Sequence, residues 1–212
     1  VANFQNGFSS ISVPSVLATL VSDELHFPNL SMVGVDDRAA AHTAVAHLIA
    51  QGHSKIAVLG GPATSFPSRM RRLGAQDAME QAGLIFDDRL YGLSNYDFES
   101  AYHAMNSLLA RRAEFTALFA MSDVIAFGAI RALVSAGFRV PQDVSVIGFD
   151  GITMSRYCVP VMTTIVQPSE QIALQSIELL INQIEHGAPA QTITLQPELQ
   201  QGESVCPCRH PL

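Results

Sequence analysis

The sequence has few charged residues and, above all, few basic ones. Lysines and arginines together number 12 of 212 residues, against 19 aspartates and glutamates, and the net charge is -7. Lys55 is the only lysine. Proteins that bind nucleic acid normally carry a basic face that neutralises phosphates. The chain as given is therefore not expected to bind DNA through its own surface.

Long apolar runs and a cysteine framework are also missing. The longest apolar stretches are short, such as residues 115–121, and none approaches the ~18 residues of a membrane span. The start of the chain shows no basic region followed by an apolar core, so no signal peptide is visible. The three cysteines, Cys158, Cys206 and Cys208, match neither a metal-binding spacing nor a disulfide framework. These absences favour a protein of the reducing cytoplasm, without a metal or cofactor and without membrane contact.

Recognisable catalytic motifs are absent as well. The glycines at 60 and 61 lack the Gly-Lys-Ser/Thr of a phosphate-binding loop, and no G-x-G-x-x-G or G-x-S-x-G pattern occurs. His47 and His53 are six residues apart, which does not match the i, i+4 pair of a helical zinc site. No catalytic residue and no metal ligand is predicted, and we expect that the chain is not an enzyme.

The sequence does contain a regular alternation of strand and helix patterns. Short apolar runs predict strands at 56–59, 90–93, 116–120 and 144–149. Amphipathic segments predict helices at 38–51, 68–82, 98–109, 123–136 and 168–186. One more strand is expected at 192–195, and the tail from 196 on is expected to be loosely ordered. Strands that alternate with helices of this length predict an α/β fold with doubly wound parallel sheets.

Four ordered stretches of the sequence resemble one protein family. They read HLIAQGHSKIA at 47–57, Ser122-Asp123 followed by Ala126 and Gly128-Ala129, VPQDVSVIGFDG at 140–151, and TTIVQP at 163–168. Their order and spacing resemble the LacI/GalR family of bacterial transcription regulators, from about residue 34 to residue 195. The stretch at 140–151 is the most specific of the four.

The resemblance implies a periplasmic-binding-protein-like type I fold, in which two doubly wound parallel-sheet lobes are joined by three crossovers. The first lobe would comprise residues 1–51 and 168–187, and the second lobe residues 54–165 and 190–205. The crossovers would fall near 52–54, 166–168 and 187–190. Members of the family carry further strand–helix units and a helix-turn-helix headpiece before the segment that begins at Val13. The chain is therefore expected to be N-terminally truncated, with an incomplete first lobe.

Ligands of open α/β sheets bind beyond the carboxyl ends of the strands, and this rule selects residues 60–67, 94–98, 121–123 and 150–152. Arg71, near the start of the helix that follows the first of these loops, and Asp150 are the first candidates. A guanidinium fork and a carboxylate suit the paired hydroxyls of a sugar. The resemblance supports Arg71, since the family uses an arginine three residues before the glycine that matches Gly74. The alternatives are that Arg71 is a solvated arginine on a charged helix, and that Asp150 forms a turn with Gly151.

Three further residues are candidates for ligand contact. Phe98 could stack on a sugar or base face, or pack in the core at a helix start. Ser122 could hydrogen-bond a ligand, or cap the helix that begins at Asp123. Gln167 lies in a predicted crossover, where it could face the ligand or make a hinge hydrogen bond.

The resemblance implies an effector-sensing and dimerisation domain of a transcription regulator. A small sugar-like metabolite would bind between the lobes, and operator DNA would be bound only by the intact protein, through its headpiece. The chain would form a homodimer with Phe127 and Cys158 at or near the twofold interface. The alternative is a periplasmic sugar-binding protein that serves a transporter; the stretches at 140–151 and 163–168 favour the regulator.

Overall fold

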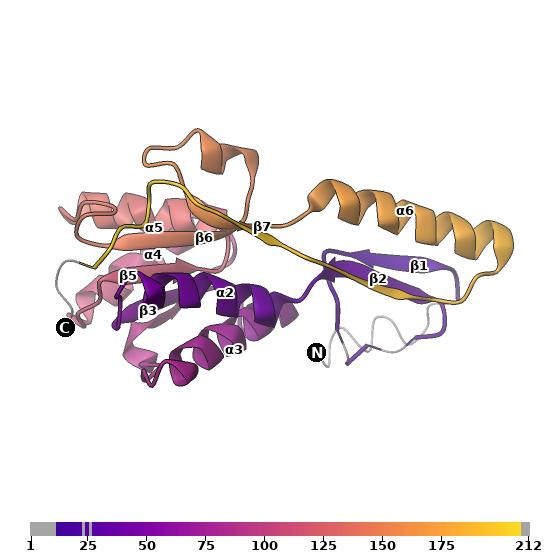
Figure 1. The fold of residues 1–212 in the computed structure, drawn as a ribbon, viewed down its shortest axis with the longest axis horizontal. Coiled ribbons are helices and arrows are strands. Elements are labelled where there is room, and N and C mark those ends of the chain that lie inside the picture. The colour runs from indigo at the N-terminus through magenta and orange to yellow at the C-terminus, as the bar shows by residue number, and fades with distance from the viewer. Residues whose placement is uncertain (1–11, 23, 26, 209–212) are drawn as a thin grey trace. The chain divides into compact units, whose positions relative to one another are not determined.

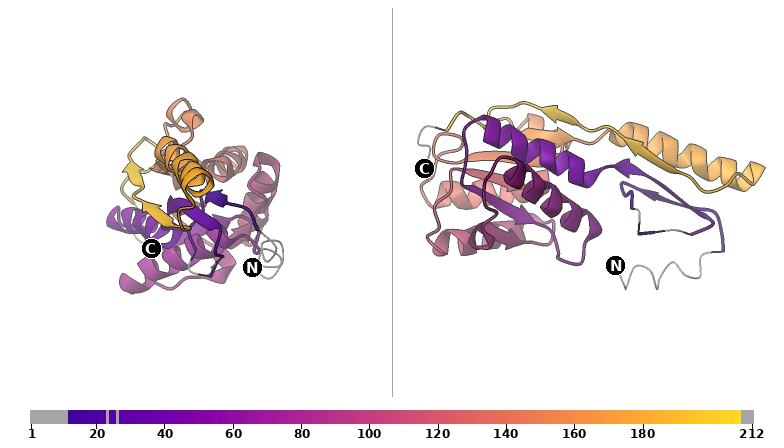
Figure 2. Two further views of the ribbon diagram at one scale, coloured as in Figure 1. Left: turned by 90° about the vertical axis from the view of Figure 1, so that its right-hand side faces the viewer. Right: turned by 60° about the horizontal axis from the view of Figure 1, so that its bottom comes forward.

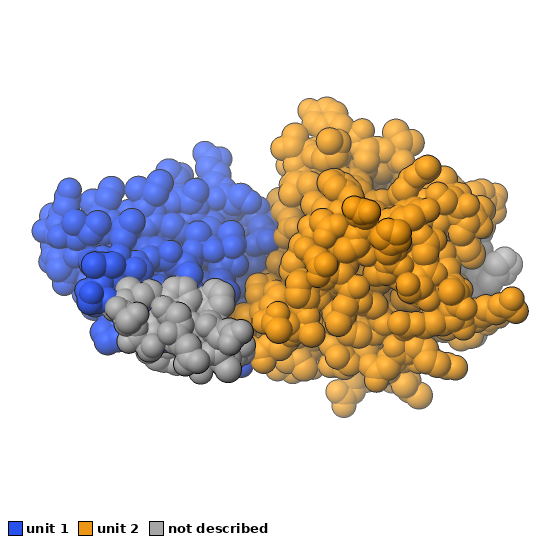
Figure 3. Space-filling view, turned by 180° about the vertical axis from the view of Figure 1, so that it is seen from behind, with its two compact units in different colours: residues 1–36, 167–197 blue, residues 37–166, 198–212 orange. Residues whose placement is uncertain are grey.

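The computed structural model describes residues 12–22, 24–25 and 27–208, and it divides the chain into two compact units (Figures 1 and 3). Unit 1 holds residues 1–36 and 167–197, and unit 2 holds residues 37–166 and 198–212. Each unit is built on its own, mostly parallel sheet, which confirms the predicted fold class. Residues 1–11, which the prediction assigns to the first lobe, lie outside the described residues.

Unit 2 is organised around a six-stranded sheet in the order β4-β3-β5-β6-β7-β9 (Figure 1). Its strands are β3 (Ile56–Gly60), β4 (Tyr91–Leu93), β5 (Ala117–Ala120), β6 (Ser145–Asp150), β7 (Thr163–Val166) and β9 (Glu198–Gln200). All neighbouring pairs are parallel except β7 with β9. β3 and β5 are buried along their whole length, as expected for parallel strands that are covered on both faces.

Four helices cover this sheet. They are α2 (Asp37–Ala50), α3 (Phe66–Gln81), α4 (Phe98–Ala110) and α5 (Asp123–Ser135). α2 packs against α3, and α4 packs against α5. α3 connects β3 to β4 on one side, whereas α4 and α5 lead in the opposite direction, to β5 and then β6. Because such crossovers are right-handed, α3 lies on one face of the sheet and α4 and α5 lie on the other.

Unit 1 contains a parallel three-stranded sheet in the order β1-β2-β8. Its strands are β1 (Ser15–Ala18), β2 (Leu30–Val35) and β8 (Thr192–Leu195). The helix α6 (Ser169–His186) packs on β1 and β2 (Figure 2). Val33 on β2 and the α6 residues Ile172 and Leu179 form the buried core cluster between them.

The two units differ from the predicted lobes in two places. The prediction assigns residues 38–51 to the first lobe, but α2 packs against α3 in unit 2, because Gly74 has no Cβ that would overlap the carbonyl of Arg38. The prediction also assigns residues 190–205 to the second lobe, whereas β8 pairs with β2 in unit 1. The second predicted crossover, at 166–168, coincides with the boundary after Val166.

The tail is more ordered than predicted. β9 pairs with β7, and the backbone N–H of Val146 donates to the carbonyl of Ser204 at 2.7 Å. The hydroxyl of Ser204 in turn donates to the carbonyl of Val146 at 2.6 Å. The polar tail is ordered because it supplies hydrogen-bond partners to backbone groups of β6 and β7 that would otherwise be unpaired.

Candidate functional site

Arg71 lies at the centre of a candidate site at the carboxyl edge of the unit 2 sheet. It projects from α3 and is only 6% exposed. Its Nε donates to Oδ1 of Asp37 at 2.7 Å, its Nη1 lies 3.5 Å from Oδ1 of Asp150, and it also donates to the carbonyl of Met121. The guanidinium carbon lies 3.6 Å from the ring centre of Phe149. The ends of β5 and β6 and the start of α2 therefore meet at one buried cation.

Asp37 is the partner that sequence reasoning missed. It is the first residue of α2 and is buried. Burial alone would lower the pKa of Arg71, but the charges of Asp37 and Asp150 raise it on balance, so the guanidinium stays charged. The sequence held a signal for this partner, since two consecutive aspartates follow an apolar strand and a carboxylate buried there would need a cation.

Asp150 ends β6 in an unusual backbone conformation. Its φ is +111°, a region that costs a residue with a Cβ on the order of 1–3 kcal/mol. The structure brings Asp150, at the end of β6, and Arg71, on α3, together, as predicted. The alternative of a solvated Arg71 is wrong, because Asp37 and the strand ends enclose it. The side chain of Asp150 keeps 28% of its surface exposed, so it can still accept hydrogen bonds from a ligand.

A second buried carboxylate supports the turn after Asp150. Asp123, at the start of α5, has no exposed surface and accepts hydrogen bonds from the Thr164 hydroxyl at 2.6 Å and the Ile152 N–H at 2.9 Å. Burial raises the pKa of Asp123 from 3.8 to about 6, although these hydrogen bonds act in the opposite direction. A Cβ on Gly148 would overlap its Oδ1. Asp123 thus holds the strained turn in place, a role that the sequence did not suggest.

Comparison with known proteins identifies the family of the chain. The family model described as a periplasmic binding protein-like domain matches residues 45–205. The solved structure of a sugar-binding transcriptional regulator of the LacI family from Escherichia coli, complexed with phosphate, is 30% identical with a TM-score of 0.79. That match covers 98% of this chain and 73% of the other. The chain belongs to the LacI/GalR family.

Curated relatives of this LacI/GalR chain are also named as regulators. The HTH-type transcriptional regulator MalR of Clostridium butyricum is 34% identical over 201 residues, which cover 94% of this chain and 60% of MalR. The HTH-type transcriptional repressor CytR of Escherichia coli is 35% identical over 172 residues, which cover 81% of this chain and 50% of CytR. The chain spans 50% to 60% of the length of these two relatives. The family expected from the four sequence stretches is confirmed.

The other predicted ligand residues of this LacI/GalR chain lie in different settings. Ser122 is buried and its hydroxyl accepts the N–H of Ile125 at 3.1 Å, so it does cap α5. Phe98 is 57% exposed at the start of α4 and stacks on Phe127 with ring centres 6.2 Å apart, so it is not a core residue. Gln167 is half-buried and belongs to unit 1. Ligand contact by these residues stays a prediction.

The two residues predicted at the dimer interface of this LacI/GalR chain are both half-buried. Phe127 lies on α5, and Cys158 follows the 3₁₀ turn Thr153–Arg156. The Sγ of Cys158 lies 3.2 Å from the carbonyl oxygen of Ser155 and 3.1 Å from that of Pro160, so its one hydrogen can be donated to either, and burial raises the pKa of the thiol. Neither residue is enclosed in the core, and their contact with a second chain stays a prediction.

Neither a metal site nor a membrane-spanning helix is found among residues 12–22, 24–25 and 27–208. Within these residues, no cluster of three or more His, Cys, Asp or Glu side chains could hold a metal ion. No helix in the same part of the chain is long and apolar enough to cross a membrane.

Proposed function

We propose that this chain is the effector-sensing part of a bacterial transcription regulator, and that its ligand is a sugar or sugar-like metabolite. The observation that carries the proposal is the buried Arg71 beside the partly exposed carboxylate of Asp150. Guanidinium donors and carboxylate acceptors together complement the vicinal hydroxyls of a sugar. Solved relatives support this ligand class: the regulator CelR, 27% identical, is in complex with cellobiose, and a LacI family regulator from Enterococcus faecium, 25% identical, holds ribose.

A ligand that engages Arg71 would exchange its contact with Asp37 for contacts of its own. Because Asp37 is the first residue of α2, this exchange would alter the packing at the start of that helix. Such a ligand has different affinities for two arrangements of the chain, which is the requirement for shifting a conformational equilibrium. In the intact regulator, that equilibrium would set the affinity of a headpiece for operator DNA.

The proposal includes a homodimer with Phe127 and Cys158 near its interface, located in the cytoplasm and without enzymatic activity. The alternative, a periplasmic sugar-binding protein of a transporter, shares the fold. It is disfavoured because MalR, CytR and the Escherichia coli LacI family structure are all named as transcription regulators. A gene sequence that encodes a helix-turn-helix upstream of this chain would support the regulator, and one that encodes a signal peptide would support the transporter protein.

The site is tested by calorimetric titration of the 212-residue chain with a panel of monosaccharides and disaccharides that includes ribose and cellobiose. Arg71→Lys keeps the charge but removes the fork, and we expect it to weaken sugar binding at least about 30-fold, equivalent to about 2 kcal/mol. Arg139→Lys is the matched control, because Arg139 is exposed and outside the site. Equal affinities of wild type and Arg71→Lys would contradict the site, and a panel without any binder would contradict the ligand class.

A further inference from the structure

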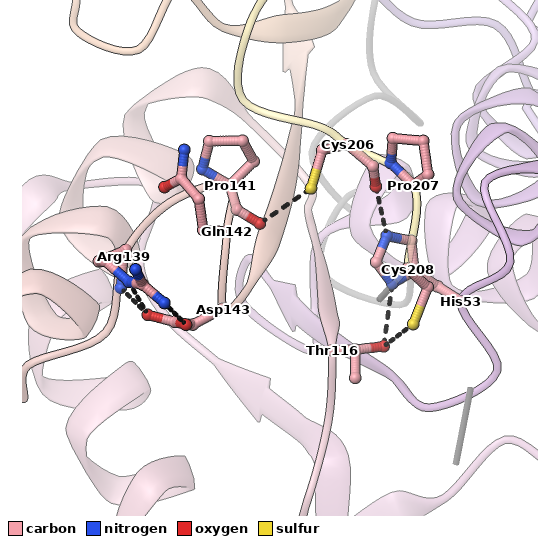
Figure 4. Close-up of a pocket in the computed structure, with 9 residues that line it drawn as sticks. All are labelled: His53, Thr116, Arg139, Pro141, Gln142, Asp143, Cys206, Pro207 and Cys208. Carbon is pink, nitrogen blue, oxygen red and sulfur yellow. Dashed lines mark hydrogen bonds and ion pairs between the residues drawn. The ribbon is translucent and has the colours of Figure 1, made fainter. Parts of the chain in front are cut away.

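A cavity of about 230 Å³ lies at the amino-terminal edge of the unit 2 sheet, opposite to the edge that carries Arg71 (Figure 4). Thr116 immediately precedes β5 at this edge, and His53 lies between α2 and β3. The tail of the chain crosses the same edge and contributes Cys206 and Cys208, with Pro207 between them. Both cysteines are half-buried, and neither forms a disulfide. Nothing in the proposed effector site uses these residues.

The hydrogen bonds around His53 define its tautomer. Its Nε2 lies 3.1 Å from the carbonyl oxygen of Cys206, and because a carbonyl only accepts, Nε2 carries the proton. Burial lowers the pKa of His53 although the Cys206 carbonyl raises it, so the ring is neutral and Nδ1 is an acceptor. Nδ1 lies 2.9 Å from Oγ1 of Thr116, which therefore donates to it. The Cys208 thiol donates to the same Oγ1 at 3.8 Å.

These bonds form a continuous path for a proton, from the thiol of Cys208 through the hydroxyl of Thr116 to Nδ1 of His53 (Figure 4). A proton that moves along it leaves a thiolate on Cys208 and an imidazolium on His53. Opposite charges formed together are less costly to bury than either alone. The other charged groups that line the cavity are Arg139 and Asp143. They are paired with each other at 2.7 Å, so the Arg139 guanidinium is already neutralised and does not pair with the thiolate.

We propose that this cavity is a thiol redox site, in which Cys208 reacts with a hydroperoxide and Cys206 resolves the product as a disulfide. The two thiols lie on the same short segment and line the same cavity, so the second can reach the first without any large movement of the sheet. The reactive group is assigned to Cys208 because only its thiol is connected to a base. The Cys206 thiol donates to the carbonyl of Pro141 at 3.3 Å, which cannot take up its proton.

The chemistry balances without a further reactant. The Cys208 thiolate attacks one oxygen of hydrogen peroxide, an S–O bond forms, the O–O bond breaks, and the departing hydroxide takes the proton held on His53 and leaves as water. Sulfur is oxidised to a sulfenic acid by two electrons and the peroxide is reduced. The Cys206 sulfur then attacks the sulfenic sulfur, an S–S bond forms, the S–O bond breaks, and hydroxide leaves with the Cys206 proton as a second water.

Formation of the disulfide would loosen the tail. In an extended chain the Cα atoms of residues two apart are up to about 7 Å from each other, at the upper limit for a disulfide, so the backbone at Pro207 has to bend. Bending draws the Cys206 thiol from the Pro141 carbonyl and the Cys208 N–H from the carbonyl of Gln51, which it now meets at 2.8 Å. The tail bonds at this edge are therefore coupled to the redox state of the two cysteines.

Mass spectrometry of the whole chain tests this proposal. The reduced protein is exposed to a small excess of hydrogen peroxide, free thiols are alkylated, and the chain is cleaved after glutamate. Cleavage after Glu203 releases Cys206 and Cys208 on one peptide, separate from the peptide that carries Cys158. We expect the tail peptide to lose two hydrogen atoms, while Cys158, whose thiol bonds only to backbone carbonyls, stays alkylated and serves as the internal control. In Cys206→Ser, a sulfenic-acid probe should label Cys208.

The proton path is tested by the rate of this oxidation in two matched variants. Thr116→Val has nearly the same shape as threonine but cannot relay a proton, and we expect it to slow oxidation of Cys208 about tenfold. Thr116→Ser restores the hydroxyl and should restore the rate, and thermal melts confirm that both variants are folded. Equal rates for Thr116→Val and wild type, oxidation of Cys158 as fast as that of Cys208, or sulfenic acid on Cys206 in place of Cys208 would each overturn the proposal.

Discussion

Replacing Arg71 by methionine isolates the energetic role of the buried ion pair in the absence of ligand. Methionine fills a similar volume and can still contact the ring of Phe149, so packing is largely kept. What is lost is the cation that neutralises Asp37, whose carboxylate is buried and 2.7 Å from the guanidinium. A buried charge that loses its partner costs about 3–5 kcal/mol. We expect the free energy of unfolding of Arg71→Met to fall by this amount at neutral pH.

The double variant Arg71→Met/Asp37→Asn decides whether the cost comes from the unpaired charge. Asp37→Asn alone should cost less than Arg71→Met, because the arginine keeps Asp150 and the Met121 carbonyl as partners. In the double variant the unpaired carboxylate is gone, so it should be more stable than the sum of the single effects predicts, by about 2 kcal/mol or more.

Urea unfolding followed by tyrosine fluorescence suits this measurement, because all four tyrosines lie in unit 2 together with the ion pair. The slope of the transition shows whether a variant has changed the compactness of either state. A loss below about 1 kcal/mol in Arg71→Met, or strictly additive single variants, would refute the reasoning that the pair is desolvated.

Two further predictions concern the surroundings of the site. The pKa of Asp123 is raised from 3.8 to about 6 in the folded chain, so between these pH values the folded state binds a proton that the unfolded state does not. The free energy of unfolding should therefore rise by about 2 kcal/mol as the pH falls from 6 to 4, and Asp123→Asn, compared with wild type by urea unfolding at several pH values, should lack this contribution. Gly74→Ala should destabilise unit 2 by about 3 kcal/mol, because its Cβ overlaps the Arg38 carbonyl across α2 and α3; an unchanged thermal midpoint would contradict that close approach.

Much of the fold was predictable because its elements are marked locally. The apolar runs and helical periodicities placed α4, α5 and β8 to within one residue of their observed bounds. The bounds of β8 could be predicted locally, but the sheet that it joins could not. Its alternating sequence fits the edge of any sheet, and only the free edge of β2 in unit 1 decides the pairing. The small residues of α2 likewise fit more than one partner, so its packing against α3 in unit 2 could not be read from its own sequence.

In the candidate site, too, some residues could be predicted from the sequence and others depend on long-range packing. The family resemblance selected Arg71, and parallel-sheet geometry then predicted that Arg71 and Asp150 converge, because both follow strands of one sheet. Asp37 was missed because it follows β2, a strand of the other sheet, so the same geometric rule does not bring it to Arg71. Asp123 was noticed only as a helix start, and its function as an acceptor for the Ile152 N–H depends on a turn that the sequence does not reveal.

The two outer strands of the unit 2 sheet have a consequence for how molecules of this protein meet one another. A sheet edge offers unpaired N–H and C=O groups to any other chain, and long, flat edges promote aggregation. Here the sheet ends on both sides in strands of three residues, β4 and β9, and β9 begins with the exposed Glu198. So short an edge, with a charge at its start, gives a second molecule few hydrogen bonds to form. The tail strand β9, which ends one side of the sheet, therefore disfavours aggregation by edge-to-edge strand pairing between molecules. This role does not depend on any ligand.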